Sequence, residues 1–207
     1  METEELTRQN IFARAFDEHL RLIEELKLQQ PMLEMIAGEM THAILGGNKI
    51  LWCGNGGSAA DSQHLAAEFV GRFRRERKAL PSLALTVDTS VLTSIANDYG
   101  YEEVFSRQVE AFCGKGDVVV GISTSGNSPN VVRALRSARE AGAFVVAFTG
   151  PGGGAMAGLA DAAICVPMKD TARVQEGHIL CGHMLCDWVE LAWCQRHARG
   201  EKTAKLA

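Results

Sequence analysis

Apolar residues recur at helical spacing near the start of the chain. Between residues 4 and 28 they form one face of a predicted helix, made of Ile11, Phe12, Phe16, Leu20, Leu22, Ile23 and Leu26. Pro31 opens a second predicted helix, which ends at Gly46 and Gly47. A minimal βαβ fold needs no such leading pair. We therefore expect the two helices either to cover one face of a sheet or to pair with the same helices of another subunit.

Beyond residue 48 the pattern changes to short, continuous apolar runs separated by helical stretches. Five runs read as strands, at residues 49–53, 82–86, 117–123, 144–149 and 162–167. Continuous runs are typical of strands buried on both faces of a parallel sheet. The pattern predicts an α/β fold: a three-layer sandwich with a five-stranded parallel sheet of the flavodoxin-like or Rossmann-like kind.

A long helix over residues 172–199 is expected to close this fold. We predict one domain over residues 1–207, with helices in 1–47, the α/β core in 48–199 and a loose tail in 200–207.

Composition narrows the classes of partner. Of 207 residues, 46% are hydrophobic and 22% charged, with a formal net charge of −4. Strong affinity for nucleic acid or an acidic membrane needs a basic surface, so small molecules and proteins remain as the expected partners. The six cysteines show no CxxC pair and read as buried thiols in a reducing compartment. No apolar run approaches the roughly 18 residues of a membrane span, and we expect a cytoplasmic protein.

One basic cluster stands apart from this acidic background. Residues 71–78, GRFRRERK, hold five basic side chains against one acid and follow a predicted helix. Cations are favoured at a helix C-terminus, and the cluster has a single aromatic residue. We therefore interpret it as a solvated helix end rather than a nucleic-acid site, with Arg72 near enough in sequence to help bind a substrate.

Two turns have the character of anion sites. CGNGGS, residues 53–58, follows the first predicted strand, and STSGNSPN, residues 123–130, follows the third. Ligands of parallel α/β sheets bind where strand ends meet helix N-termini, because free N–H groups and the helix dipole favour negative charge there. The second turn adds the hydroxyls of Ser123, Thr124, Ser125 and Ser128. Neither turn is a dinucleotide fingerprint or a P-loop, and a phosphate group is the expected occupant.

Candidate acid–base residues follow the first turn. His64 and Glu68, four residues apart, share one face of the predicted helix. By itself such a pair is more often an ordinary surface contact, and Asp61 one turn earlier equally suits the helix dipole. On the last helix Gln175 and His183 are about two turns apart and can approach one site. His178 is rotated away from His183, which favours a structural or supporting role.

The motifs together resemble a known family. GISTSGNSPNVVRALRSAREAG is similar to the signature of the sugar-isomerase (SIS) domain. CGNGGSAADSQHLAAEFVGRF, IANDYGYEEVFSRQVEA and RVQEGHILCGHMLCDWVE resemble the phosphoheptose isomerases within it, and the likeness extends from about residue 11 to 194.

This resemblance implies an aldose–ketose isomerase that converts D-sedoheptulose 7-phosphate to D-glycero-D-manno-heptose 7-phosphate through an enediol, for heptose and lipopolysaccharide precursors. It implies Glu68 as general base and His183 as general acid, and one zinc ion per subunit on His64, Glu68, Gln175 and His183. The implied substrate contacts are Asn55, Gly56, Gly57, Glu68, Asn97, Asp98, Ser123, Thr124, Ser125, Ser128 and Gln175. A homotetramer with sites between subunits is implied as well.

Two further readings remain open at this point. A non-catalytic SIS-domain adaptor, of the type that associates with the bacterial replication initiator, would need the fold but not an acid–base pair. A sugar-phosphate sensor would bind without turnover. Ala172 stands where some relatives have an aspartate, so a third carboxylate there is not a requirement.

Overall fold

The computed structural model describes residues 8–204, with the backbone alone for residues 9 and 199–204. A single 3-10 turn, η1 (Arg8–Asn10), leads into α1 (Ile11–Lys27) and α2 (Gln30–Leu45). Residues 4–7 of the first predicted helix lie outside the described part. The second predicted helix is confirmed, with its proline in the first turn of α2.

Five parallel strands form one sheet in the order β2-β1-β3-β4-β5. They are β1 (Ile50–Gly54), β2 (Ser82–Ala84), β3 (Val118–Ser123), β4 (Phe144–Thr149) and β5 (Ala162–Cys165). This is the flavodoxin-like order: β2 is added on one side of β1, and the later strands are added on the other side, so the order of the strands across the sheet changes direction between β1 and β3. The prediction of a five-stranded parallel α/β fold is confirmed.

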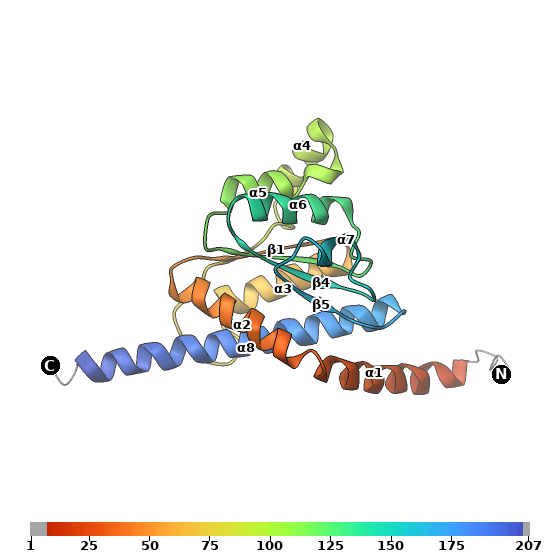
Figure 1. Ribbon diagram of the computed structural model, residues 1–207, viewed down its shortest axis with the longest axis horizontal. Coiled ribbons are helices and arrows are strands. Elements are labelled where there is room, and N and C mark those ends of the chain that lie inside the picture. The colour runs from red at the N-terminus through yellow and green to blue at the C-terminus, as the bar shows by residue number, and fades with distance from the viewer. Residues whose placement is uncertain (1–7, 205–207) are drawn as a thin grey trace.

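Helices cover both faces of the sheet (Figure 1). They are α3 (Gly57–Val70), α4 (Thr89–Tyr99), the 3-10 turn η2 (Tyr101–Glu103), α5 (Ser106–Phe112), α6 (Pro129–Glu140), α7 (Gly154–Ala157) and α8 (Thr171–Ala204). One core joins α2, α3 and α8 to the face that carries Trp52 and Phe148. The other core joins α5, α6 and α7 to the face that carries Leu51 and Val119. Residues of β1, β3 and β4 alternate between the two cores, which explains why these runs are apolar throughout, whereas the edge strand β2 is not buried on both faces and leaves Leu83 exposed.

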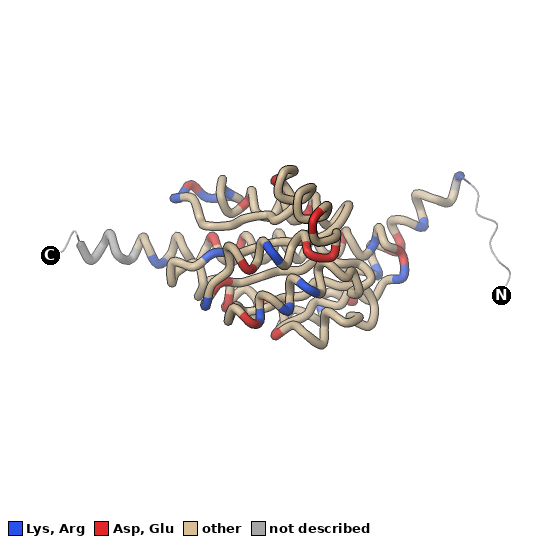
Figure 2. Tube along the Cα trace, turned by 90° about the horizontal axis from the view of Figure 1, so that it is seen from above, with Lys and Arg blue, Asp and Glu red and all other residues tan. Residues whose placement is uncertain are grey.

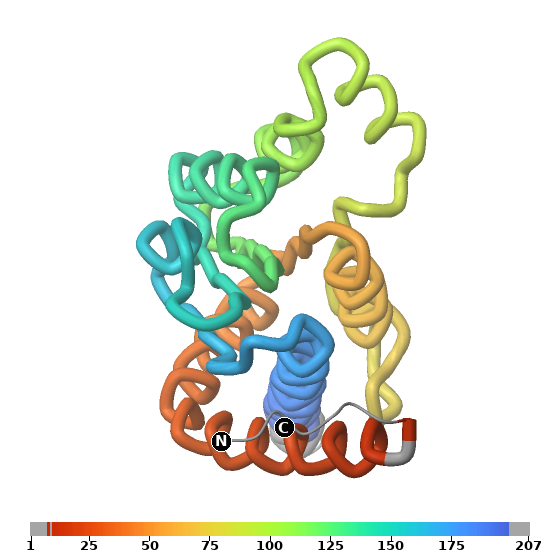
Figure 3. The backbone as a smooth tube through the Cα atoms, turned by 90° about the vertical axis from the view of Figure 1, so that its right-hand side faces the viewer, coloured from red at the N-terminus to blue at the C-terminus, as the bar shows by residue number. Residues whose placement is uncertain are grey.

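The second leading helix has one of the two roles expected of the pair, since it covers a face of the sheet. α2 packs on the sheet beside α8, with Ile36 and Met40 fully buried. α1 crosses α8, which is seen nearly end-on in Figure 3. On the outer half of α1, Phe12 is 72% exposed and Phe16 is 70% exposed.

The last helix is longer than predicted. It begins at Thr171, one residue before the expected start, and its backbone continues to Ala204 rather than ending near residue 199. A lone Gly200 costs a helix only about 1 kcal/mol relative to alanine, so it does not force an end. Residues 205–207 of the predicted tail lie outside the described part.

The expectation of buried thiols holds for three of the six cysteines, and Cys113, Cys165 and Cys194 are only half-buried. All six thiols are free, and those of Cys53, Cys181 and Cys186 are buried. In Figure 2 the basic and acidic positions are interspersed along the described chain. Among residues 8–204, no helix combines the length and the apolar character needed to cross a bilayer.

Candidate active site

The turn after β1 is built so that backbone groups lie close together. A Cβ on Gly54 would lie 2.8 Å from Ser58 and 2.9 Å from the carbonyl oxygen of Ile122, so only glycine fits there. Gly56 has a φ of +56°, which favours glycine, and it stands at the N-terminus of α3. The turn therefore presents the positive end of the α3 dipole at the carboxyl edge of the sheet, where an anion is stabilised.

The turn after β3 lies beside the first, because Gly54 and Ile122 are register partners in neighbouring strands. Its hydroxyls form a small cluster: Ser123 Oγ lies 2.8 Å from Ser128 Oγ and 3.2 Å from Ser125 Oγ. Pro129 follows in the first turn of α6. The structure thus brings both predicted anion turns to one edge of the sheet.

A pair of amides connects the two turns. Asn55 Nδ2 donates to Asn130 Oδ1 at 2.9 Å, and Asn130 Nδ2 donates to Asn55 Oδ1 at 2.8 Å. Asn130 is buried in the first turn of α6. Sequence reasoning missed this residue, because nothing local distinguishes its amide from a helix-start residue. The pair fixes the distance between the turns.

An imidazole–carboxylate cluster lies between α3 and α8. His64 Nε2 is 2.9 Å from His183 Nε2 and 3.4 Å from Glu68 Oε1. One donor atom from each of the three residues lies within 4.8 Å of the others. His64 and Glu68 are therefore more than a surface pair on one helix, since α8 adds a third titratable group to the same point.

Gln175 reaches the other end of this helix pair. Its amide nitrogen is only 2.3 Å from the point where a Cβ on Gly57 would stand, so the amide rests directly on that glycine. His183 then meets His64 about two turns further along both helices, or roughly 11 Å. The two helices run side by side in one direction, from the anion turns toward the cluster. The contact that the structure gives Gln175 is with Gly57.

Local electrostatics favour a neutral imidazole at the cluster. Burial lowers the pKa of His183, and the charge of His64 lowers it further, whereas Glu68 opposes the shift. Burial raises the pKa of Asp61 despite the nearby His64, and its buried Oδ2 has no hydrogen-bond partner. Two imidazoles and a carboxylate with clustered donor atoms are an ordinary zinc ligand set, and the residues present fit such an ion.

Comparison with known proteins shows which family this chain resembles. Residues 14–150 match the SIS domain. A phosphoheptose isomerase of Aquifex aeolicus is 55% identical over 161 residues, which cover 78% of this chain and 84% of the relative. One of Helicobacter hepaticus is 50% identical over 182 residues, which cover 88% and 93%.

The chain belongs to the phosphoheptose isomerase family.

Solved structures agree with that membership. Phosphoheptose isomerase GmhA from Neisseria gonorrhoeae superposes with a TM-score of 0.83 at 46% identity, and the match covers 89% of this chain and 99% of the other. A phosphoheptose isomerase from Francisella tularensis gives a TM-score of 0.86 at 33% identity, with 90% and 100% covered.

Two residues implied by the phosphoheptose isomerase resemblance lie apart from the cluster. Asn97 and Asp98 are exposed on α4, where Asn97 Nδ2 donates to Asp98 Oδ1 at 2.8 Å. Just beyond them, the hydroxyl of Tyr101 donates to Asn55 Oδ1 at 3.2 Å. α4 therefore ends close to the first anion turn, and the role of these two residues in binding substrate stays a prediction.

His178 is an interior residue of this phosphoheptose isomerase family member. Its ring is fully buried, with Nε2 3.0 Å from the carbonyl oxygen of Thr149 at the end of β4. Burial lowers its pKa to about 4, although the contact with Thr149 opposes the shift. This placement agrees with the structural or supporting role that its rotation from His183 favours.

The basic cluster at residues 71–78 is not simply a solvated helix end. α3 ends at Val70, and the cluster forms the loop that follows. The side chain of Arg77 is 1% exposed and paired with Glu190, whereas that of Arg72 is 61% exposed. The interpretation as a solvated cluster is therefore wrong for Arg77. Sequence reasoning also missed Phe73, whose ring stacks on His183 with centroids 5.5 Å apart.

Proposed function

We propose that this protein is a phosphoheptose isomerase, which converts D-sedoheptulose 7-phosphate to D-glycero-D-manno-heptose 7-phosphate. The observation that carries the proposal is the convergence of His64, Glu68 and His183 at one point between α3 and α8. Identities of 50–55% to named phosphoheptose isomerases supply the substrate. We infer a place in making heptose for lipopolysaccharide or a related surface glycan.

The turns after β1 and β3 would bind the sugar phosphate. Their glycines, hydroxyls and helix N-termini favour a dianion at this edge of the sheet. The groups proposed for this role are Asn55, Gly56, Gly57, Ser123, Thr124, Ser125 and Ser128, with Asn97, Asp98 and Gln175 completing the substrate site. With the phosphate held there, the sugar carbons extend along α3 and α8 toward the cluster.

The reaction moves two protons. Glu68 takes the proton from C1 of the ketose, and the electron pair forms the C1–C2 double bond of the enediol. Return of a proton to C2 gives the aldose, while the hydrogen on O1 leaves and O2 gains one. His183 is the proposed acid for transfers at the oxygens.

A zinc ion on His64, Glu68, Gln175 and His183 is the proposed cofactor, one per subunit. When bound, it supplies Lewis acidity toward the carbonyl and enediolate oxygens. His64, Glu68 and His183 already place their donor atoms together, whereas Gln175 contacts Gly57 about two turns earlier on α8 and would have to turn from that glycine to join them. Glu68 then has two duties, as ligand and as base.

We further propose a homotetramer in the cytoplasm. Phe12, Phe16 and Leu20 are exposed along α1. A neighbouring apolar groove of about 290 Å³ lies between the leading helices and α8, with Leu26, Leu33 and Trp188 in its lining. Association of copies through this face would remove the rings from water. Light scattering after size-exclusion chromatography tests the assembly, and a monomer would contradict it.

The non-catalytic alternatives are not favoured. An adaptor or a sensor needs no acid and base in contact, yet this chain keeps Glu68 and His183 at one point with His64 between them. Sugar phosphate binding without turnover would support the sensor. Recovery of the replication initiator on purified protein that has no isomerase activity would support the adaptor.

The test is turnover of sedoheptulose 7-phosphate by purified protein, with and without a chelator. We expect formation of the aldose, loss of activity after chelation and recovery with added Zn²⁺. Glu68→Gln and His183→Ala should each lose most activity, whereas Glu140→Gln, on an exposed face of α6, should lose none. Unchanged turnover in both site variants would contradict the roles assigned to Glu68 and His183 and, with them, the proposed function.

A further inference from the structure

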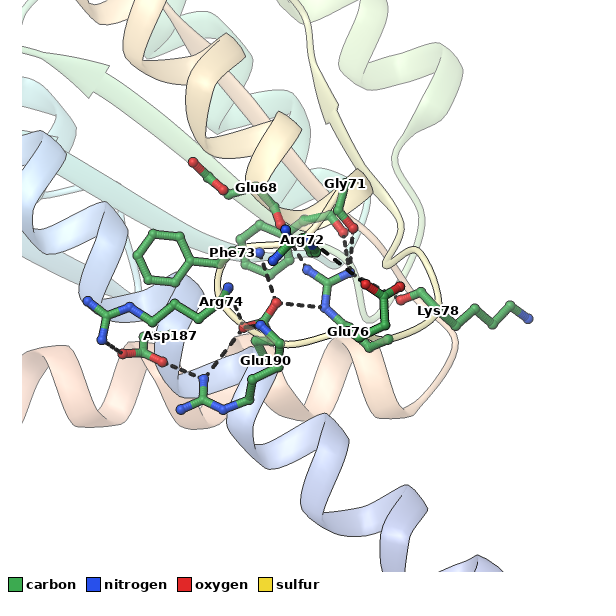
Figure 4. A network of polar contacts seen from close by, with 12 residues as sticks. Glu68, Gly71, Arg72, Phe73, Arg74, Glu76, Lys78, Asp187 and Glu190 are labelled. Atoms are coloured by element: carbon green, nitrogen blue, oxygen red, sulfur yellow. Dashed lines mark hydrogen bonds and ion pairs between the residues drawn. The ribbon is translucent and has the colours of Figure 1, made fainter.

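A buried carboxylate two turns beyond His183 organises the loop that follows α3. Glu190 is 1% exposed, and both of its oxygens accept hydrogen bonds from the backbone of the loop at residues 71–78. Phe73 N–H donates to Oε1 at 2.9 Å, while the N–H groups of Arg74 and Arg75 donate to Oε2 at 2.8 and 2.9 Å. Figure 4 shows these contacts converging on Glu190.

The guanidinium of Arg77 connects the same carboxylate to the catalytic helix. Its Nε lies 3.2 Å from Glu190 Oε1 as an ion pair, and both side chains are about 1% exposed. Nη2 donates to the carbonyl oxygen of Glu68 and Nη1 to that of Phe69, each at 2.8 Å. Arg77 thus caps carbonyls at the C-terminal end of α3, which carries the proposed base, and it shares the Phe69 carbonyl with the N–H of Leu80.

The loop held in this way places an aromatic ring on the proposed acid. Phe73 stacks on the imidazole of His183 at 26° between the ring planes, and the Arg74 guanidinium lies 5.1 Å from the centre of the Phe73 ring. Arg74 and Arg75 both pair with Asp187, one turn after His183 on α8. His183, Asp187 and Glu190 therefore form one stripe of α8 that faces the loop.

We propose that Glu190 is a positioning residue for catalysis: it holds the 71–78 loop so that Phe73 fixes the His183 ring and Arg77 fixes the end of α3 behind Glu68. The inference rests on the proposed isomerase function. Glu190 lies two turns from His183 and acts through Phe73 and Arg77, so it is not itself a catalytic residue.

The carboxylate form is needed for this role. Burial alone would raise the pKa of Glu190, but the three backbone N–H groups and Arg77 outweigh burial and lower it. A glutamine in its place would keep one accepting oxygen and turn an N–H₂ group toward backbone donors. At least one backbone N–H of the loop would then lose its acceptor, and the loop would shift.

The experiment compares Glu190→Gln and Phe73→Leu, singly and combined, with the wild-type protein. Loss of ring placement should lower kcat about 10- to 100-fold, as small misplacements of reacting groups do, with KM within about twofold. Because Phe73 transmits the effect, the double variant should be little worse than Glu190→Gln. Phe73→Tyr keeps the stacked ring and should retain most of kcat.

Asp117→Asn is the matched control. Asp117 is also buried, accepts hydrogen bonds from the backbone N–H groups of Lys49 and Gly114, and pairs with Lys49 Nζ at 2.6 Å. It lies just before β3, at the opposite edge of the sheet from the site. Its variant should lower the melting temperature, as Glu190→Gln does, but leave kcat of the folded protein unchanged.

Hydrogen exchange supplies a readout that needs no substrate. Peptides that cover residues 71–78 should exchange faster in Glu190→Gln and keep wild-type protection in Asp117→Asn. A wild-type kcat in folded Glu190→Gln would overturn the proposal, and so would a wild-type kcat in Phe73→Leu. A double variant whose loss of kcat equals the product of the two single losses would overturn it as well. If Glu190→Gln does not fold, the kcat values of Phe73→Leu and Phe73→Tyr are compared instead. A low kcat in Phe73→Leu alone would support the proposal, and equal kcat values in the two variants would overturn it. Failure of the wild-type protein to isomerise sedoheptulose 7-phosphate would instead overturn the proposed function.

Discussion

Replacing Gly57 by alanine tests the contact between the first anion turn and Gln175. Gly57 is the first residue of α3, and its φ is not in the positive range, so alanine fits the backbone there. The added methyl would stand 2.3 Å from Gln175 Nε2, and ordinary contact begins at 3.4 Å. The amide must therefore retreat by about 1.1 Å.

The expected cost falls on activity and not on stability. The end of a glutamine side chain is flexible, and alanine is favoured over glycine in a helix by up to about 1 kcal/mol. The free energy of unfolding should be unchanged or slightly raised. A displacement of about 1 Å at a substrate or metal contact can cost up to about 100-fold in kcat/KM, and we expect a loss of about 10- to 100-fold.

The assay is kcat/KM for sedoheptulose 7-phosphate together with urea unfolding. Gly38→Ala is the control, because Gly38 is also helical and a Cβ there would meet nothing within 4 Å. Gly57→Ala should add little to Gln175→Ala if the methyl acts through the amide. An equal loss in both backgrounds would refute the reasoning, because the methyl would then obstruct the substrate directly.

Three further predictions concern the site and its supports. Gly54→Ala should lower the free energy of unfolding by about 1–3 kcal/mol or more in urea titrations, because its Cβ would meet backbone oxygens of Ser58 and Ile122 at 2.8–2.9 Å; unchanged stability would contradict this packing. The lowered pKa of His178 places the proton preferentially on the unfolded chain, so stability is full above pH 6.5 and falls toward pH 4, by up to about 3 kcal/mol. His178→Gln should flatten the pH–stability curve between pH 6.5 and 4. An identical slope in the variant and the wild-type protein would show that protonation of His178 is not the cause of the fall in stability. Tyr101→Phe removes the hydroxyl bonded to Asn55 and should raise KM more than it lowers kcat; unchanged KM would argue against a binding role for the end of α4.

Local sequence signals predicted the fold and the two anion turns. The central strands are continuous apolar runs because neighbouring residues such as Leu51 and Trp52 enter opposite cores. The turns were found because glycines and hydroxyls follow two runs directly, and the parallel sheet brings both to one edge. Such features depend on a few consecutive residues, which is why pattern alone is sufficient.

Contacts between distant residues had no such signal. Spacing placed Gln175 and His183 on one face of a helix, but only the resemblance joined them to His64 and Glu68, more than a hundred residues earlier. The structure adds the contact of Gln175 with Gly57. Asn97 and Asp98 likewise came from the resemblance, and pattern alone would not have connected α4 with the site.

The loop at residues 71–78 and the residues that hold it beside the site were the part least predictable from the sequence. A run of arginines with one phenylalanine reads as a solvated surface, because composition does not reveal that Glu190 accepts from its backbone. The buried Arg77 is identified only by its partners on two different helices.

Isomerisation in deuterium oxide tests the central claim, that Glu68 moves a proton within the cluster it shares with His64 and His183. We predict aldose that carries deuterium at C2 and ketose that exchanges at C1 with the wild-type protein, and neither product with folded, metal-loaded Glu68→Gln. Formation of deuterated aldose by Glu68→Gln at the wild-type rate would contradict the account.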